Sequence, residues 1–131
     1  MRIIEVVGAV ITHGERVLCA QRGDAGSLPL KWEFPGGKIE PGETPRQALE
    51  REIQEELQCS VDVGREITTT VHAYDFATIS LTTFLCTLVS GEPRLSEHAA
   101  VRWLAPADLP PLDWAPADIP AVEMVASGLT S

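Results

Sequence analysis

Residues 37 to 57 carry acidic side chains at a fixed spacing. Gly37 is followed six positions later by Glu43, and the run from Arg51 to Glu56 reads Arg-Glu-Ile-Gln-Glu-Glu. Three of the four glutamates in this pattern would share one short helix, where crowding of like charges lowers stability. A bound divalent cation is the natural compensation, and an ion held by carboxylate oxygens suits phosphate chemistry.

Local signals place this helix from about Pro45 to Leu57. Thr44 is a favoured N-cap residue, Pro45 fits the first helical position, and Gln47 completes a Thr-x-x-Gln capping box. Every third or fourth residue is apolar, which predicts a stripe that packs on a sheet.

The acidic side chains fall beside that stripe. At about 100° per residue, the stripe is formed by Leu49, Ile53 and Leu57, and the adjoining flank by Glu52, Glu55 and Glu56. An acidic flank of this kind is often only a solvated helix face. The segments around it favour a cleft instead.

The pattern Gly37-x5-Glu43-x7-Arg51-Glu52-Ile53-x-Glu55-Glu56 resembles the Nudix box, the signature of the Nudix hydrolases. That signature normally continues with a glycine, where this chain has Gln58. A left-handed conformation at Gln58 would cost about 1 kcal/mol. The substitution concerns how the helix ends and leaves the acidic positions intact.

The resemblance extends over the whole chain and is strongest to the MutT-type nucleotide pyrophosphohydrolases. The run Trp32 to Glu40 resembles the segment that leads into the box in that group, and Ala115 to Pro120 resembles its base-contacting segment. Arg22 occupies a position where MutT-like proteins often carry a purine-contacting arginine.

The resemblance implies an α/β fold: an α/β/α sandwich with a mixed β-sheet and the catalytic helix of the box, as a single domain over residues 1–131. Periodicity and turn residues agree. The expected strands are Ile3 to Thr12, Arg16 to Gln21, Ser60 to Tyr74, Thr78 to Val89 and Ala99 to Leu104. A closing helix is expected over Ala117 to Ser127, with Ile119, Val122 and Val125 as its apolar face.

By the same resemblance, the site would bind Mg²⁺, or Mn²⁺, through oxygen ligands. The candidate ligands are the Gly36 carbonyl and the side chains of Glu52, Glu55, Glu56 and Glu97. The implied reaction is attack of water on a phosphorus of a nucleoside triphosphate, giving the monophosphate and pyrophosphate. Glu52 is the first candidate for deprotonating that water and Glu97 the second.

Three further residues belong to this catalytic region. Glu43 and Arg51 are expected to pair and to orient the loop against the helix, without a direct chemical role. Lys38 is a candidate phosphate contact, although it could equally be a solvated lysine.

The base that is read depends on Asp118. MutT relatives that hydrolyse 8-oxo-dGTP usually carry an asparagine at the matching position, which both donates and accepts hydrogen bonds. An ionised aspartate only accepts, which suits the amino group of cytosine. It could also accept from the N1 and N2 hydrogens of guanine, so the choice widens towards cytidine nucleotides or mixed specificity. Asp118 could also be only the N-cap of the last helix. Phe34 and Trp114 could stack on a base, or be core aromatics.

Composition and charge limit the kinds of molecule that this protein is expected to bind. A formal charge of −9 argues against binding a nucleic acid polymer, so a small-molecule nucleotide is the expected partner. Nothing resembles a membrane span or an address segment. The three cysteines lack metal or disulfide spacing and predict reduced, mostly buried thiols in a cytoplasmic protein. We expect a monomer or a small homo-oligomer. His13, His72 and His98 lack metal spacing and are expected in turns or on the surface.

Three functions therefore remain: hydrolysis of oxidised nucleotides such as 8-oxo-dGTP, hydrolysis of CTP or dCTP, and a Nudix-shaped binding module without turnover. The third predicts loss of acidic residues from the box, and all of them are present.

Overall fold

The computed structural model describes residues 2–94 and 98–129. Glu97, predicted as a metal ligand or base, lies outside these residues. In the described chain, seven strands form one sheet. The strands are β1 (Ile3–His13), β2 (Arg16–Gln21), β3 (Trp32–Glu33), β4 (Gly36–Lys38), β5 (Ser60–Ala73), β6 (Thr78–Ser90) and β7 (Ala100–Leu104).

Strand β1 is the centre of the sheet. It runs parallel to β6 along its length and pairs antiparallel with β4 near its start and with β2 near its end. The remaining pairs, β2 with β3 and β7 and β5 with β6, are antiparallel. The predicted mixed sheet is therefore confirmed, and both ends of each predicted strand match the structure within one residue.

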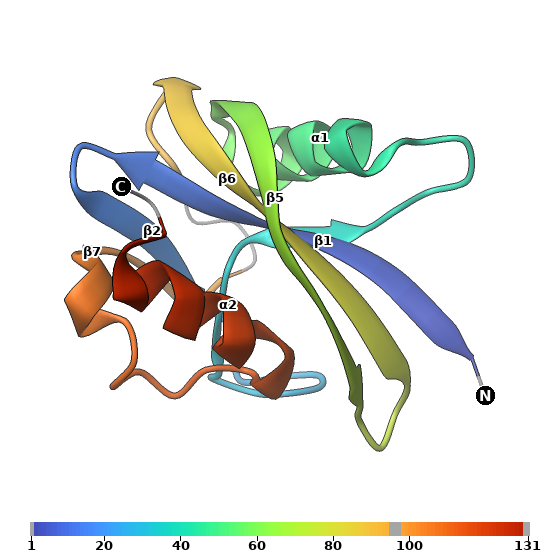
Figure 1. The fold of residues 1–131 in the computed structure, drawn as a ribbon. Helices are drawn as coiled ribbons and strands as arrows, with labels where there is room; N and C mark the ends of the chain where they lie inside the picture. Colours follow the sequence, from blue (N-terminus) through green and yellow to red (C-terminus); the bar gives the residue numbers. More distant parts are fainter. Residues whose placement is uncertain (1, 95–97, 130–131) are drawn as a thin grey trace.

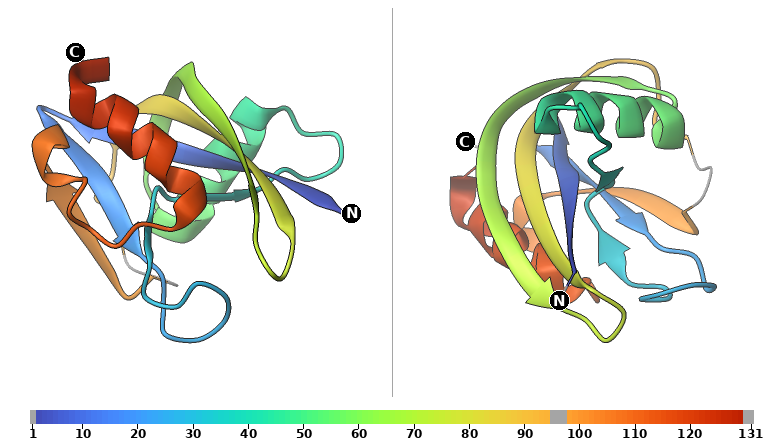
Figure 2. Two further views of the ribbon diagram at one scale, coloured as in Figure 1. Left: turned by 60° about the horizontal axis from the view of Figure 1, so that its bottom comes forward. Right: turned by 90° about the vertical axis from the view of Figure 1, so that its right-hand side faces the viewer.

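Both faces of the sheet are covered. Residues 7–11 of β1 are buried without interruption, as expected for a strand with helices on either side. Val7 and Ile11 belong to the core beneath the helix α1 (Pro45–Leu57), whereas Val10 belongs to the core beneath the helix α2 (Ile119–Met124). Figure 1 shows α1 and α2 on opposite sides of the sheet, and both views of Figure 2 agree. The predicted three-layer sandwich is confirmed.

Helix α1 begins and ends where the local signals place it. The Thr44 side chain accepts from the Gln47 N–H at 3.1 Å, and the Gln47 side chain accepts from the Thr44 N–H at 3.0 Å. Leu49, Ile53 and Leu57 are fully buried. Gln58 ends the helix with φ 54°, so it adopts the left-handed conformation that usually favours glycine.

The C-terminal segment differs from the predicted single helix. It is a 3₁₀ turn (η2, Pro116–Asp118), then α2, then a wide turn (η3, Val125–Leu129). The α-helix starts late because Pro120 has no N–H to donate to the carbonyl of Pro116. The predicted apolar face is correct for Val122 and Val125 but wrong for Ile119, which is exposed.

Ala121 takes the buried place beside Val122 instead, because the 3₁₀ turn rotates the start of the helix. A second 3₁₀ turn, η1 (Pro106–Asp108), precedes this segment. None of the helices in the described residues has the length and apolar character of a membrane span.

Candidate active site

The glycine strand β4 lies directly against the acidic flank of α1. A Cβ on Gly37 would overlap the carboxyl group of Glu52, and a Cβ on Gly36 would overlap the backbone carbonyl of Val7 in β1. Gly36 is therefore required for the pairing of β4 with β1. Gly37 is required for a different reason, since its missing side chain makes room for a carboxylate.

The predicted pair between Glu43 and Arg51 is present and bidentate. Arg51 Nε lies 2.7 Å from Glu43 Oε2, and Nη2 lies 2.8 Å from Oε1. The Arg51 hydrogen bonds lower the pKa of Glu43 to about 2. Arg51 also donates to the Lys38 carbonyl at 3.1 Å, so this one guanidinium joins the loop, β4 and α1.

The three glutamates of the helix lie in different environments. The Glu52 side chain is 16% exposed and the Glu55 side chain 61%, and each lies 3.6 Å from Arg51 Nη1. Burial raises the pKa of Glu52, Arg51 opposes that rise, and the charge of Glu55 adds to it. Glu56 is mostly buried, with Oε2 3.9 Å from His98 Nε2.

The oxygen atoms of these glutamates are the kind of ligand that a hard divalent cation prefers. Carboxylate oxygens beside the backbone of Gly36 are the ligands that Mg²⁺ prefers. The space beside Gly37 holds the Glu52 carboxylate, whose ionised form burial disfavours and a bound cation would favour. Within residues 2–94 and 98–129, no three acidic, histidine or cysteine side chains converge as a ready-made metal cage. An ion shared with a phosphate would need fewer protein ligands.

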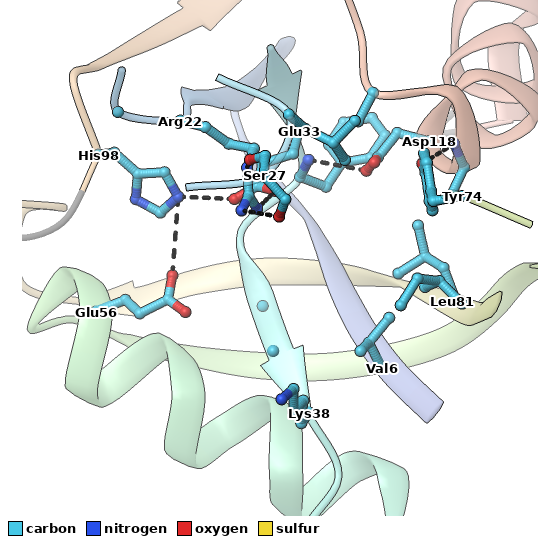
Figure 3. A pocket seen from close by; sticks show the side chains of 18 of the residues that line it. Val6, Arg22, Ser27, Glu33, Lys38, Glu56, Tyr74, Leu81, His98 and Asp118 are labelled. Carbon is cyan, nitrogen blue, oxygen red and sulfur yellow. Dashed lines mark hydrogen bonds and ion pairs between the residues drawn. The ribbon is translucent and has the colours of Figure 1, made fainter. Parts of the chain in front are cut away.

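A cavity of about 650 Å³ opens beside this helix, within the range of small-molecule sites. Figure 3 shows Lys38 and Glu56 on its α1 side and Tyr74 and Asp118 at the opposite end. Of the predicted site residues, the ones that line it are Arg22, Phe34, Gly36, Lys38, Glu56 and Asp118. Glu52 lies against the lining residue Gly37, while Glu43, Arg51 and Glu55 are not among the lining residues.

A network that the sequence did not indicate crosses the cavity wall. Glu33 Oε1 accepts from Arg22 at 2.9 Å, and Glu33 Oε2 lies 3.0 Å from His98 Nε2. Arg22 also donates to the Ser27 carbonyl at 3.0 Å, so it holds the loop that follows β2. Figure 3 shows His98 between Glu33 and Glu56.

The expectation that His98 lies in a turn or on the surface is wrong. Its side chain is only 6% exposed, and its Nδ1 has no hydrogen-bond partner among the described residues. The sequence contains one indication of this network, which is that Glu33 lies within the run Trp32 to Glu40 that resembles the segment leading into the box. His98 offered none, because its partners lie 65 and 42 residues away in sequence.

Asp118 forms the floor of the far end of the cavity. Asp118 as a whole residue is 5% exposed. Its carboxylate accepts a hydrogen bond from the Phe34 N–H at 3.1 Å. Burial raises the pKa of Asp118 well above its ordinary value, against the opposing effect of the Phe34 N–H. Asp118 occupies the N-cap position of α2, but its side chain makes no capping hydrogen bond to that helix.

Two aromatic side chains, Phe34 and Tyr74, line the same cavity as that carboxyl group. Phe34 lines the cavity and packs on Trp114, with ring centroids 4.9 Å apart. Trp114 is a core residue that donates to the Leu109 carbonyl at 2.7 Å. Tyr74, which the sequence reading did not single out, lines the cavity and accepts from the Ala117 N–H at 2.8 Å.

The fold and this site define a Nudix hydrolase. The family model of the NUDIX domain matches residues 3–125, and the chain belongs to that family. The CTP pyrophosphohydrolase of Escherichia coli K12 is 37% identical over 123 residues, which cover 94% of this chain and 91% of that protein. The 8-oxo-dGTP diphosphatase of the same strain is 31% identical over 116 residues, covering 88% and 90%.

A solved structure is more similar in sequence than either of these two enzymes. It is the DNA mismatch repair protein MutT of methicillin-resistant Staphylococcus aureus 252, also assigned to the Nudix hydrolases. It is 51% identical, covers 96% of this chain and 97% of its own, and superposes with a TM-score of 0.79. The predicted family, MutT-type resemblance and fold are thus confirmed.

Proposed function

We propose that this Nudix hydrolase cleaves nucleoside triphosphates to the nucleoside monophosphate and pyrophosphate, with Mg²⁺ or Mn²⁺ as cofactor. One observation carries the proposal: a single cavity is lined by the glycine strand beside the acidic helix and also by the buried Asp118 carboxyl group with the aromatic side chains of Phe34 and Tyr74. A ligand that fits both ends has a polyphosphate at one end and a planar heterocycle at the other. The names of the two relatives from E. coli support this class.

At the phosphate end, Glu52, Glu55, Glu56 and the Gly36 carbonyl would hold the ion. When bound, such an ion neutralises charge on the phosphates and makes its water more acidic. Lys38 would contact a phosphate oxygen, since it lines this end of the cavity. Glu52 would accept the proton of the attacking water, and Glu97 is the alternative base. Arg51, held by Glu43, would orient the glycine strand against the helix.

At the base end, Asp118 would read the heterocycle. Burial favours its protonated form, which donates one hydrogen bond while its other oxygen accepts from the Phe34 N–H. A protonated aspartic acid thus regains the donor that asparagine supplies in the relatives that act on 8-oxo-dGTP. We therefore place oxidised guanine nucleotides first. An ionised Asp118 would instead accept from the amino group of cytosine, which keeps CTP and dCTP as the second candidates.

A substrate panel tests the proposal. Purified protein with Mg²⁺ is assayed for pyrophosphate release from 8-oxo-dGTP, dGTP, dCTP, CTP and ADP-ribose, with chelator-treated protein as the control. The highest kcat/KM is expected for 8-oxo-dGTP. A preference for CTP or dCTP would replace that substrate with the second candidate. No turnover of any triphosphate would reduce the protein to a binding module.

We further propose that residues 1–131 act as one domain, as a monomer or small homo-oligomer in the cytoplasm, on a small-molecule nucleotide. The three cysteines are buried, which agrees with the reduced thiols on which the location rests. Burial raises the pKa of the Cys19 and Cys86 thiols to about 12, so neither is a reactive thiolate at neutral pH.

A further inference from the structure

Strand pairing around β2 brings His98 and Glu33 together. Strands β3 and β7 both pair with the last residues of β2. Ala20 pairs with Glu33, and the Ala99 N–H donates to the Gln21 carbonyl at 2.8 Å. The backbone therefore places the Glu33 and His98 side chains beside the end of β2, on the wall of the cavity.

The ring of His98 is held by the Glu33 carboxylate. His98 Nε2 lies 3.0 Å from Glu33 Oε2, and an ionised carboxylate only accepts, so Nε2 carries the hydrogen of this bond. Glu33 is itself oriented by Arg22, whose Nη1 lies 2.9 Å from Oε1. Each oxygen of Glu33 thus has its own partner, and rotation of the His98 ring would break one of the two contacts.

The same ring nitrogen faces the acidic helix. His98 Nε2 lies 3.9 Å from Glu56 Oε2, which is longer than a hydrogen bond. His98 therefore acts on Glu56 by its position, while its hydrogen bond goes to Glu33. The His98 side chain is 6% exposed and the Glu56 side chain 14%, so both are confined by the surrounding protein. Figure 3 shows the two contacts of this ring nitrogen.

The other two glutamates of the helix face a side chain that is held in the same way. Glu43 holds Arg51 through a bidentate pair, and Arg51 Nη1 lies 3.6 Å from Glu52 and from Glu55. In both arrangements a carboxylate outside α1 holds a nitrogen-bearing side chain, and that side chain faces glutamates of α1. Arg51 does so for two of them, and His98 for the third.

We propose that His98 is a positioning residue for the metal site: held by Glu33, its ring keeps the Glu56 carboxylate turned towards the cavity, where the ion binds. This inference deepens the proposed function and rests on its assignment of Glu56 as a metal ligand. A carboxylate that is already oriented loses less conformational freedom when it binds an ion. Residues that orient metal ligands commonly contribute about 10- to 100-fold to metal affinity.

The affinity of the metal-free protein for Mn²⁺ tests this role without turnover. Dissociation constants for Mn²⁺ are measured by calorimetry for the wild type, His98→Leu, His98→Gln and Glu33→Gln. Leucine removes the ring nitrogens, whereas the amide nitrogen of glutamine can donate to Glu33 in place of Nε2. His13→Leu is the matched control, because His13 is exposed at the end of β1 and is not among the residues that line the cavity. Thermal unfolding of each metal-free variant is recorded.

His98→Leu is expected to raise the dissociation constant for Mn²⁺ about tenfold, and His98→Gln by less than about threefold. His13→Leu should leave it unchanged. Glu33→Gln should also weaken Mn²⁺ binding, with little further effect in a His98→Leu background, because Glu33 acts on the ion through His98. In turnover, the Mn²⁺ concentration for half-maximal rate should rise in His98→Leu, with little change in kcat at saturating Mn²⁺.

An unchanged dissociation constant for Mn²⁺ in His98→Leu would overturn the inference. Tighter binding would also overturn it, because the ring would then compete with the ion for Glu56. Equal weakening in His98→Leu and His98→Gln would show that the bond to Glu33 is not what matters. If His98→Leu does not fold, Glu33→Gln decides in its place, and an unchanged dissociation constant there overturns the inference.

Failure of the proposed function is distinguishable from failure of this inference. It would appear as absent turnover of every triphosphate by a wild type that binds Mn²⁺. Wild-type turnover together with an unchanged dissociation constant in His98→Leu refutes only the role of His98. A wild type that binds no Mn²⁺ overturns the inference, and the substrate panel then decides separately whether the proposed function stands.

Discussion

Replacing Gly37 by alanine tests whether the glycine strand exists to admit the Glu52 carboxylate. The added Cβ would lie 3.0 Å from Glu52 Oε1 and closer still to the carboxyl carbon and to Oε2. The obstructing atoms are the end of a flexible side chain, so Glu52 should swing away while the fold survives. A shift of about 1 Å in a reacting group can lower turnover about 100-fold, while the overpacking itself costs about 1–3 kcal/mol.

Gly36→Ala is the matched control in the same strand. Its Cβ would overlap the Val7 carbonyl oxygen and lie 2.9 Å from the Gly8 Cα, so the obstruction is backbone that cannot swing away. The strand pairing of β4 with β1 would have to open, with a larger loss of stability than in Gly37→Ala. Thermal unfolding should therefore separate the two variants, with Gly36→Ala the less stable.

Rates of pyrophosphate release complete the comparison. If Gly37→Ala acts through Glu52, it should cost about 100-fold in the wild type but much less in a Glu52→Gln background, since residues that act as a unit are not additive. Wild-type turnover in Gly37→Ala, or the same factor lost in both backgrounds, would refute the reasoning.

Three further predictions concern acidic residues. Glu52→Gln should fold normally and lose on the order of 10³-fold in kcat, because the attacking water loses its base; near-wild-type kcat would remove Glu52 from the chemistry. Asp118→Asn should change the ranking of bases in the substrate panel more than the maximal rate. It should also flatten the fall in unfolding free energy as pH rises from about 4, because a carboxyl whose pKa is raised by folding stabilises only below that raised pKa. Glu43→Gln should flatten the acid limb of the stability curve. Because the folded pKa of Glu43 is about 2, its pair with Arg51 stabilises the fold above pH 4.5, and this contribution is lost as the pH falls towards 2. Chemical denaturation at a series of pH values measures the slope of unfolding free energy against pH for Asp118→Asn and Glu43→Gln. Slopes equal to those of the wild type would contradict both predictions.

Helix α1 was predictable because its determinants are close together in sequence. Thr44 and Gln47 are three residues apart and satisfy each other's backbone groups, and the left-handed Gln58 follows the last apolar position. The pair of Glu43 and Arg51 spans only eight residues. The apolar face of the last helix was mispredicted at Ile119, since a proline-induced 3₁₀ turn changes the angular position of each later side chain.

The base end could not be assembled in the same way. Phe34 and Asp118 are 84 residues apart, and Glu33 and His98 are 65 apart. Whether Asp118 caps a helix or faces a ligand depends on which segment packs over it, and local spacing carries no such information.

Spacing along the chain was sufficient to establish the box helix, its acidic flank and the family resemblance, because helical periodicity and capping act over a few residues. Only folding in three dimensions established that Glu52 fills the space beside Gly37 and that Asp118 is buried. Burial and contact between distant segments set the pKa values and the shape of the site, and these arise only when the sheet brings the segments together.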